Sequence, residues 1–229
     1  MIKGRAARTY GKALDNGSSW GAGGEVIDPI NPKIGKALSA FDMTHNFVMS
    51  YSYHVPFDKL WRPNRLTDGW ILTGVTRFTT GLPILLSEPD DSSLLGTGFS
   101  GPCGCMVDVP NVTSGSLKFT NPRLGNLDTG TNPYFTTSLF SDENFGQLGD
   151  ANRRYFHGPG LNNWDLAVLK DVRLTETKRL EFRVEFFNVF NHAQFQAPTG
   201  NILSSSFGFV TNTVNNNQRI GQFAAKFYF

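Results

Sequence analysis

The stretch Arg179-Leu-Glu-Phe-Arg-Val-Glu-Phe186 alternates charged and apolar side chains without a break. A period of two predicts a β-strand, because successive side chains of a strand point to opposite faces of the sheet. One face of this strand therefore carries Leu180, Phe182, Val184 and Phe186, and the other carries only charged residues. We interpret these charges as partners of opposite charges on neighbouring strands rather than as an acid–base pair of an enzyme.

The preceding segment, Trp164 to Leu174, alternates in the same way, and the short polar stretch Thr175 to Lys178 separates the two. We predict an antiparallel hairpin. Because the apolar residues of both strands have even numbers, directly opposed residues must have numbers with an even sum. Like charges in direct opposition are unfavourable, which favours one register. In that register Leu174 faces Leu180, Asp171 faces Arg183, Arg173 faces Glu181, Val172 faces Phe182 and Val168 faces Phe186.

Strand patterns also occur in His45 to Phe57, Gly69 to Thr80, Arg219 to Phe229 and, less clearly, Arg8 to Leu14. The sequence thus predicts about six strands. Between them lie long segments without a sustained period, rich in Gly, Pro, Asn, Asp, Ser and Thr, which are Asn16 to Lys36, Ile84 to Gly160 and His192 to Asn217. Connections of this length are unusual in compact soluble domains. Transmembrane barrels, in contrast, alternate long outer loops with short inner turns.

The composition supports an all-β protein and excludes two classes. Charged residues make up 17% of the chain, against 20 Phe and 24 Gly, which suits strands joined by glycine-containing loops. The formal net charge of +2 with scattered Lys and Arg argues against a nucleic-acid partner. No apolar stretch approaches the roughly 20 residues of a membrane-spanning helix. Met1 to Tyr10 lacks an apolar signal-peptide core, so for a secreted barrel we expect the true N-terminus to lie upstream.

Three features favour a transmembrane barrel over a soluble sandwich. The strands reach about ten residues, the length that a tilted strand needs to cross a bilayer. Aromatic residues gather near strand ends and the short turn, at Phe57, Trp61, Trp70 and Phe190, where interfacial girdles belong. The chain stops on an aromatic strand with Phe223, Phe227 and Phe229 on one face, whereas most soluble chains end in polar tails. We predict an all-β antiparallel meander forming a partial transmembrane β-barrel.

Several segments resemble the C-terminal end of Oar-like TonB-dependent receptors, in that family's order. They are spread over most of the chain and include Phe41 to Phe47, Tyr53 to Phe57, Gly69-Trp70, Gly81-Leu-Pro83, Trp164 to Lys170, Leu180 to Asn191, Phe195 to Pro198 and Arg219 to Phe229. The resemblance implies that residues 1–229 are the C-terminal segment of such a barrel. The plug, the segment that contacts the TonB protein and the carboxypeptidase-regulatory-like domain, which the family places upstream, have no counterpart in the sequence.

The resemblance also implies a function and a set of partners. It implies a receptor in the outer membrane of Gram-negative cells that takes up a substrate with energy relayed from the inner membrane. The expected partners are outer-membrane lipid, the barrel assembly machinery, and the remainder of the barrel with its plug. TonB is expected to contact the receptor only through the missing plug region. Phe223, Phe227 and Phe229 are the expected assembly signal. Lumenal charge pairs are expected between Asp171 and Arg183 and between Arg173 and Glu181.

No residue pattern in the sequence predicts catalysis, a cofactor or a bound metal, so we expect no enzyme. His45, His54, His157 and His192 lack any metal-ligand spacing, and we interpret them as ordinary strand or loop residues. Cys103 and Cys105 fit either an oxidised loop pair or two plain thiols. Two alternative functions remain open at this point. One is a secreted β-sandwich or carbohydrate-binding module, and the other is a general porin-like channel.

Overall fold

The computed structural model describes residues 2–18, 25–28, 30–60, 62, 64–96, 106–215 and 217–229, without the side chains of residues 58 and 60. Trp61 of the predicted aromatic girdle, and both Cys103 and Cys105, lie outside the described residues. Within the described part, no helix is long and apolar enough to cross a membrane.

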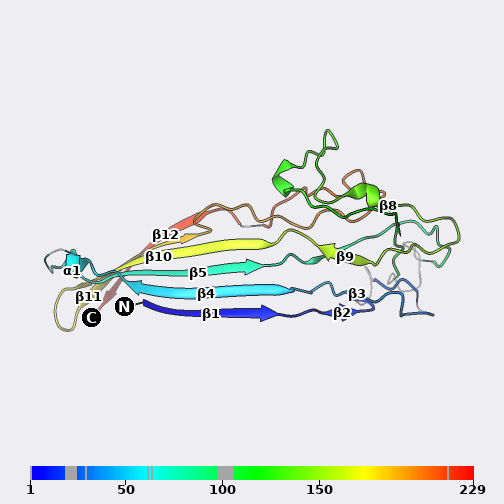
Figure 1. Ribbon diagram of the computed structural model, residues 1–229. Coiled ribbons are helices and arrows are strands. Elements are labelled where there is room, and N and C mark those ends of the chain that lie inside the picture. The colour runs from blue at the N-terminus through cyan, green and yellow to red at the C-terminus, as the bar shows by residue number, and fades with distance from the viewer. Residues whose placement is uncertain are drawn as a thin grey trace.

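One six-stranded sheet dominates the molecule, with every neighbouring pair antiparallel and the strand order β1-β4-β5-β10-β11-β12 (Figure 1). This order is the predicted meander, because each strand pairs with the next long strand in the chain. The alternating segments of the sequence supply these strands, which are β1 (Ile2–Tyr10), β4 (His45–His54), β5 (Trp70–Thr79), β10 (Leu161–Arg173), β11 (Arg179–Phe187) and β12 (Ile220–Tyr228). No pairing among the described residues joins β1 to β12, so the sheet is open.

The connections alternate between short and long, as expected for a barrel. Residues 55–69, which include the one-turn helix α1 (Phe57–Leu60), and residues 174–178 make the short connections at one end of the sheet. Residues 11–44, 80–160 and 188–219 make the long ones at the other end, and Figure 1 shows both chain ends on the side of the short connections. We call the described residues of the three long connections the outer cluster.

The outer cluster has a hydrophobic core of its own, which the sequence did not predict. Phe135 packs edge to face against both Phe140 and Phe156 there, with Phe135 and Phe156 centroids 4.6 Å apart, and Ile84 and Leu86 are buried in the same core. Short elements frame it, which are β2 (Leu14–Asp15), β3 (Ala37–Leu38), β6 (Pro83–Leu85), β7 (Asn111–Val112), β8 (Phe140–Ser141), β9 (Arg154–His157) and the 3-10 turns Pro122–Leu124 and Thr137–Leu139. The apolar residues that sustain this core have no period in sequence because most of them lie in irregular backbone.

The hairpin of β10 and β11 is antiparallel, and its opposed residue numbers have an even sum, as predicted. The predicted register is wrong by two residues. Val172 faces Leu180, Val168 faces Val184, Asp171 faces Glu181 and Arg173 faces Arg179. Neither Asp171–Arg183 nor Arg173–Glu181 is an opposed pair, and neither Val172–Phe182 nor Val168–Phe186 is.

The turn and the third strand explain this register. The backbone N–H groups of Leu174 and Thr175 both donate to the Lys178 carbonyl, at 2.9 and 3.1 Å, and the Thr175 hydroxyl accepts from the Lys178 N–H at 3.1 Å. These bonds place the centre of the turn one residue earlier in the chain than the register predicted from the charges. The opposed acidic residues each have a cation nearby, because Arg179 reaches Asp171 along the diagonal and Lys226 of β12 lies opposite Glu181.

Candidate functional site

The two faces of the sheet differ sharply in polarity. The apolar face consists of the even residues of β1, β5, β10 and β11 and the odd residues of β4 and β12, which the registers bring to the same side. We call the opposite side the polar face. The six strands place eleven charged residues on the polar face, which are Lys3, Arg5, Arg77, Asp165, Asp171, Arg173, Arg179, Glu181, Arg183, Glu185 and Lys226. On the apolar face of the same strands, the only charged residues are Arg8 and Lys170.

The apolar face remains uncovered over its C-terminal strands. Phe223 and Phe227 of β12 are 67% and 48% exposed. The ring of Phe223 stacks on Phe182 of the neighbouring strand, at 6.1 Å between centroids. A soluble sandwich buries such a face under a second sheet. An exposed apolar band across a sheet matches the lipid-facing surface of a transmembrane barrel.

A row of aromatic rings crosses the apolar face near the outer cluster. Phe47 of β4 lies 6.2 Å from Phe78 of β5, which meets Trp164 of β10 edge to face at 5.7 Å, and Trp164 meets Phe190 in the same manner at 5.7 Å. At the other end of the sheet Phe57 contacts Trp70 at 6.2 Å. The sequence identified Phe57, Trp70 and Phe190 as girdle residues but missed Phe47, Phe78 and Trp164, although each has an aromatic neighbour on the next strand. Aromatic rings at both ends are typical of a barrel's two interfaces.

The two cations of the apolar face lie toward opposite ends of their strands. Lys170 faces Trp70, the first residue of β5, and its amine donates to the Asp68 carbonyl while lying 5.3 Å from the centroid of the Trp70 ring. Arg8 faces Phe47, near the outer cluster. Cations near strand ends extend their charge to the membrane surface while their stems stay among apolar groups.

A glycine on β5 opens a narrow slot in the apolar face. Gly74 lies between Tyr51 of β4 and Leu166 of β10 in the ladders. A Cβ atom at Gly74 would lie 2.5 Å from the Tyr51 hydroxyl oxygen and 2.8 Å from Leu166 Cδ2. Because Gly74 has no side chain, the Tyr51 ring can lie across β5 and fill the space above the glycine, and the strand needs no bulge.

The polar face of β10, β11 and β12 carries a lattice of charged side chains that contact one another across and along the strands, instead of the predicted pairs. Arg179 reaches diagonally to Asp171, with Nη1 3.4 Å from Oδ2, and its guanidinium carbon lies 4.0 Å from the centroid of the Tyr228 ring. Glu181 faces Lys226 in the ladder. The four residues predicted as lumenal pairs thus do lie on one polar face, but Asp171 contacts Arg179 along the diagonal, Arg183 contacts Glu185 on its own strand, and Glu181 faces Lys226 of β12. The prediction considered only directly opposed residues of β10 and β11.

Farther along the polar face, one carboxylate joins two strands. Arg183 Nη2 lies 2.5 Å from Glu185 Oε1 on the same strand, and the side-chain amide of Gln222 on β12 donates to the same carboxylate. Asn163 and Asp165 continue the polar surface on β10, with the Asn163 amide donating to Asp165 Oδ1 at 3.0 Å. This face offers a hydrogen-bonding wall of mixed charge.

The predicted assembly residues lie where the alternation places them. Phe223 and Phe227 are on the apolar face of β12, and Phe229 follows the end of that strand, with its ring stacked 6.0 Å from Phe227. Their role as an assembly signal stays a prediction.

The outer cluster contains a buried ion network that the sequence did not predict. Arg153 is fully buried and donates to the Glu25 carboxylate, to the Asp15 carboxylate and, at 3.0 Å, to the Gly35 carbonyl. Arg154 joins Glu25 from the other side. The network ties the first long connection to β9, and its partners are too far apart in sequence for any local pattern to reveal them.

A second polar centre joins the first long connection to β9 at the edge of the sheet. Asp42 accepts from the Ala13 N–H at 2.6 Å and from the Thr44 hydroxyl at 2.9 Å, and its Oδ2 lies 2.8 Å from His157 Nε2. Burial alone would raise the pKa of Asp42, but these hydrogen bonds and the attraction of His157 together hold that pKa below its ordinary value of 3.8. His157, the last residue of β9, is therefore a structural partner of a carboxylate.

The sequence matches the outer membrane beta barrel domain family over residues 2–222. The chain belongs to this family. Family membership, the all-β meander and the exposed apolar face together place it in the outer membrane. Neither the curated proteins nor the solved structures contain a match to the sequence.

Proposed function

We propose that this chain is the C-terminal wall of an Oar-like TonB-dependent receptor, which takes up a substrate through its barrel. The observation that carries this proposal is the mixed-charge polar face of β10, β11 and β12, opposite a face suited to lipid. In a barrel the polar face lines the lumen. Charges of both signs, already held in a lattice, suit a wall that grips a plug domain through hydrogen bonds and ion pairs.

The segment Phe186 to Asn191, which lies within the resemblance to this family, has a clear structural role. Asn188 directly follows β11 and has a φ of +48°, a conformation that Asn tolerates better than most residues. The buried Asn188 amide donates to the carbonyls of His192 and Asn217, at 2.9 and 2.6 Å, and its Oδ1 accepts from the His192 N–H. Asn188 thereby ties the exit of β11 to the approach of β12.

The open edges of the sheet support a larger barrel. β1 and β12 each have one unpaired edge among the described residues, and unpaired backbone groups in hydrocarbon cost several kcal/mol each. We propose that upstream strands close the barrel, that a plug fills it, and that TonB acts only through that plug. Outer-membrane lipid and the barrel assembly machinery are the remaining proposed partners.

A general porin-like channel is the second candidate, because the same polar face would also line an open pore. Single-channel recording separates the two functions. The protein extracted from outer membranes and inserted into planar bilayers should give no steady conductance if a plug fills the barrel. A stable open-channel current would support the porin instead. In energised cells, photo-crosslinking of the full-length protein to TonB is the complementary test, and its absence would contradict the receptor.

A further inference from the structure

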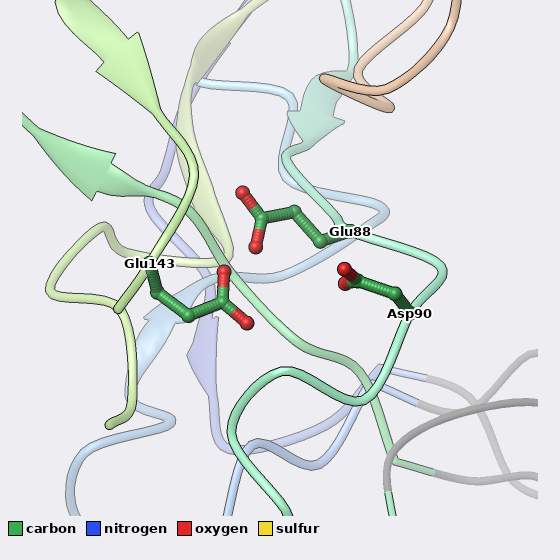
Figure 2. Close-up of side chains that lie close together, drawn as sticks. All are labelled: Glu88, Asp90 and Glu143. Atoms are coloured by element: carbon green, nitrogen blue, oxygen red, sulfur yellow. The ribbon is translucent and has the colours of Figure 1, made fainter. Parts of the chain in front are cut away.

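Three acidic side chains converge inside the outer cluster. Glu88 follows β6, Asp90 lies two residues later, and Glu143 follows β8. One carboxylate oxygen from each lies within 4.8 Å of the other two. Figure 2 shows the three carboxylates pointing into the same space from two separate segments of the chain.

Glu88 and Glu143 are buried without a compensating partner among the described residues, and Asp90 is half-buried beside them. Glu88 is 2% exposed and Glu143 is 7% exposed. Both oxygens of each, and Oδ1 of Asp90, accept no hydrogen bond. None of the three residues forms an ion pair with a lysine, arginine or histidine of the described part. Buried ionised carboxylates without partners are strongly unfavourable, and three of them close together repel one another as well. Such an arrangement is stable when a cation occupies the shared space.

The surrounding backbone fixes the positions of these ligands. The Glu88 N–H donates to the Asp108 carbonyl at 2.9 Å, in an isolated antiparallel bridge. The Ser92 hydroxyl donates to Asp90 Oδ2 at 2.8 Å, which leaves Oδ1 for a ligand. The Ser92 carbonyl in turn accepts from the Gly146 N–H at 2.7 Å, which joins the Asp90 loop to the segment that follows Glu143.

The chemistry of the group selects calcium. Carboxylate oxygens are the ligands of hard divalent cations, and a site with three acidic residues favours a charge of at least two. Ca²⁺ binds oxygen at about 2.3–2.6 Å in flexible geometry. The three oxygens lie within 4.8 Å of one another, which is close enough for one ion to contact all of them. Mg²⁺ demands near-ideal octahedral geometry, which irregular loops seldom provide.

We propose that Glu88, Asp90 and Glu143 form a Ca²⁺ site that clamps the exit of β6 to the exit of β8. The remaining coordination positions are filled by water or backbone carbonyls. Bound Ca²⁺ neutralises the buried carboxylates and holds the outer cluster closed. The proposal does not depend on the transport function, because the ligands all belong to the outer cluster.

Isothermal titration calorimetry with CaCl2 tests the site. The protein is extracted from outer membranes in detergent, treated with a chelator and then titrated with CaCl2, with MgCl2 in a parallel run. We expect saturable binding of one Ca²⁺ per chain and weaker binding of Mg²⁺. We also expect Ca²⁺ to slow proteolysis of the outer cluster. Absence of saturable Ca²⁺ binding at millimolar concentrations would overturn the proposal.

Variants locate the ion and separate binding from folding. Glu143→Gln and the double variant Glu88→Gln/Glu143→Gln should weaken Ca²⁺ binding more than about tenfold, since each removes a charged ligand. Asp90→Asn, at a less buried position, serves as a second variant if the double variant does not assemble. Asp128→Asn is the matched control, because Asp128 is an exposed carboxylate in the same cluster. Unchanged Ca²⁺ affinity in assembled Glu143→Gln and Asp90→Asn proteins would place the ion elsewhere and contradict the proposal.

Discussion

Asp171 lies directly opposite Glu181 in the ladder of β10 and β11, although both side chains are acidic. Each is compensated by a cation from another direction, Asp171 by Arg179 along the diagonal and Glu181 by Lys226 of the next strand. The register of the hairpin therefore reflects the turn bonds at Lys178, the diagonal contact on the hairpin and a cation of β12, and directly opposed charges of two strands do not determine it alone.

Reversal of the charge at Lys226 tests this dependence. Lys226→Glu places three carboxylates side by side on β10, β11 and β12, so we expect a loss of about 0.5–1 kcal/mol in unfolding free energy. Urea unfolding in detergent micelles measures it. The double variant Lys226→Glu/Glu181→Lys should recover most of the loss, and Lys178→Glu in the short turn is the control. A Lys226→Glu protein as stable as the wild type would show that the charge contacts across β10, β11 and β12 do not stabilise the fold.

The terminal aromatics are predicted to control assembly. Phe227→Asp puts a charge on the apolar face at the lipid boundary, and deletion of Phe229 removes the last aromatic residue, so both should lower the amount of heat-modifiable protein in the outer membrane several-fold. Ala224→Asp is the matched control, because Ala224 is on the polar face of the same strand opposite Arg183. Equal outer-membrane levels of the Phe229 deletion and the wild type would remove the case for an assembly signal.

Replacement of the buried Arg153 should lower the stability of the outer cluster strongly. Arg153→Met leaves the carboxylates of Asp15 and Glu25 without their shared partner, and breaking a buried pair in this way costs about 3–5 kcal/mol. Near-UV circular dichroism during thermal unfolding reports on the aromatic core beside it. Arg123→Met, an exposed arginine of the same cluster, should have little effect. Similar melting of the two variants would mean that the ion network contributes nothing net.

Acid should loosen the contact between Asp42 and its partners. The folded-state pKa of Asp42 is lower than its ordinary value, so the carboxylate stabilises the fold above about pH 4. This stabilisation is lost as the pH falls through the lowered folded-state pKa. We expect the stability difference between the wild type and Asp42→Asn, measured by the same dichroism signal, to shrink between pH 7 and pH 3. A difference that stays constant over this range would exclude Asp42 as the titrating group.

The sequence predicted the sheet well because strand alternation is a local property. The one weak strand, β1, begins at Ile2 rather than at Arg8, because its apolar face contains Gly4 and Ala6, which give little hydrophobic contrast. Gly74 similarly weakens the period of β5. The predicted strands and their antiparallel order were therefore confirmed, whereas the register, which also depends on the turn bonds and on diagonal and third-strand contacts, was wrong.

The sites of the outer cluster were beyond the reach of local patterns. Arg153 and Glu25 lie 128 residues apart, and Glu88 and Glu143 come from segments that follow two different short strands. Each of these residues occurs in a stretch without sustained periodicity. Only the fold of the long connections brings the acidic side chains together, so the candidate calcium site emerges from the structure alone.

Lipid accessibility along β11 tests the central claim that the even residues of this strand face the bilayer. In a background with Cys103→Ser and Cys105→Ser, single cysteines at positions 180–186 carry a spin label whose relaxation is measured with oxygen and with a water-soluble nickel complex. The account predicts that positions 180, 182, 184 and 186 are reached mainly by oxygen in the lipid, and that positions 181, 183 and 185 are not. Alternation with the opposite phase, or no alternation, would contradict it.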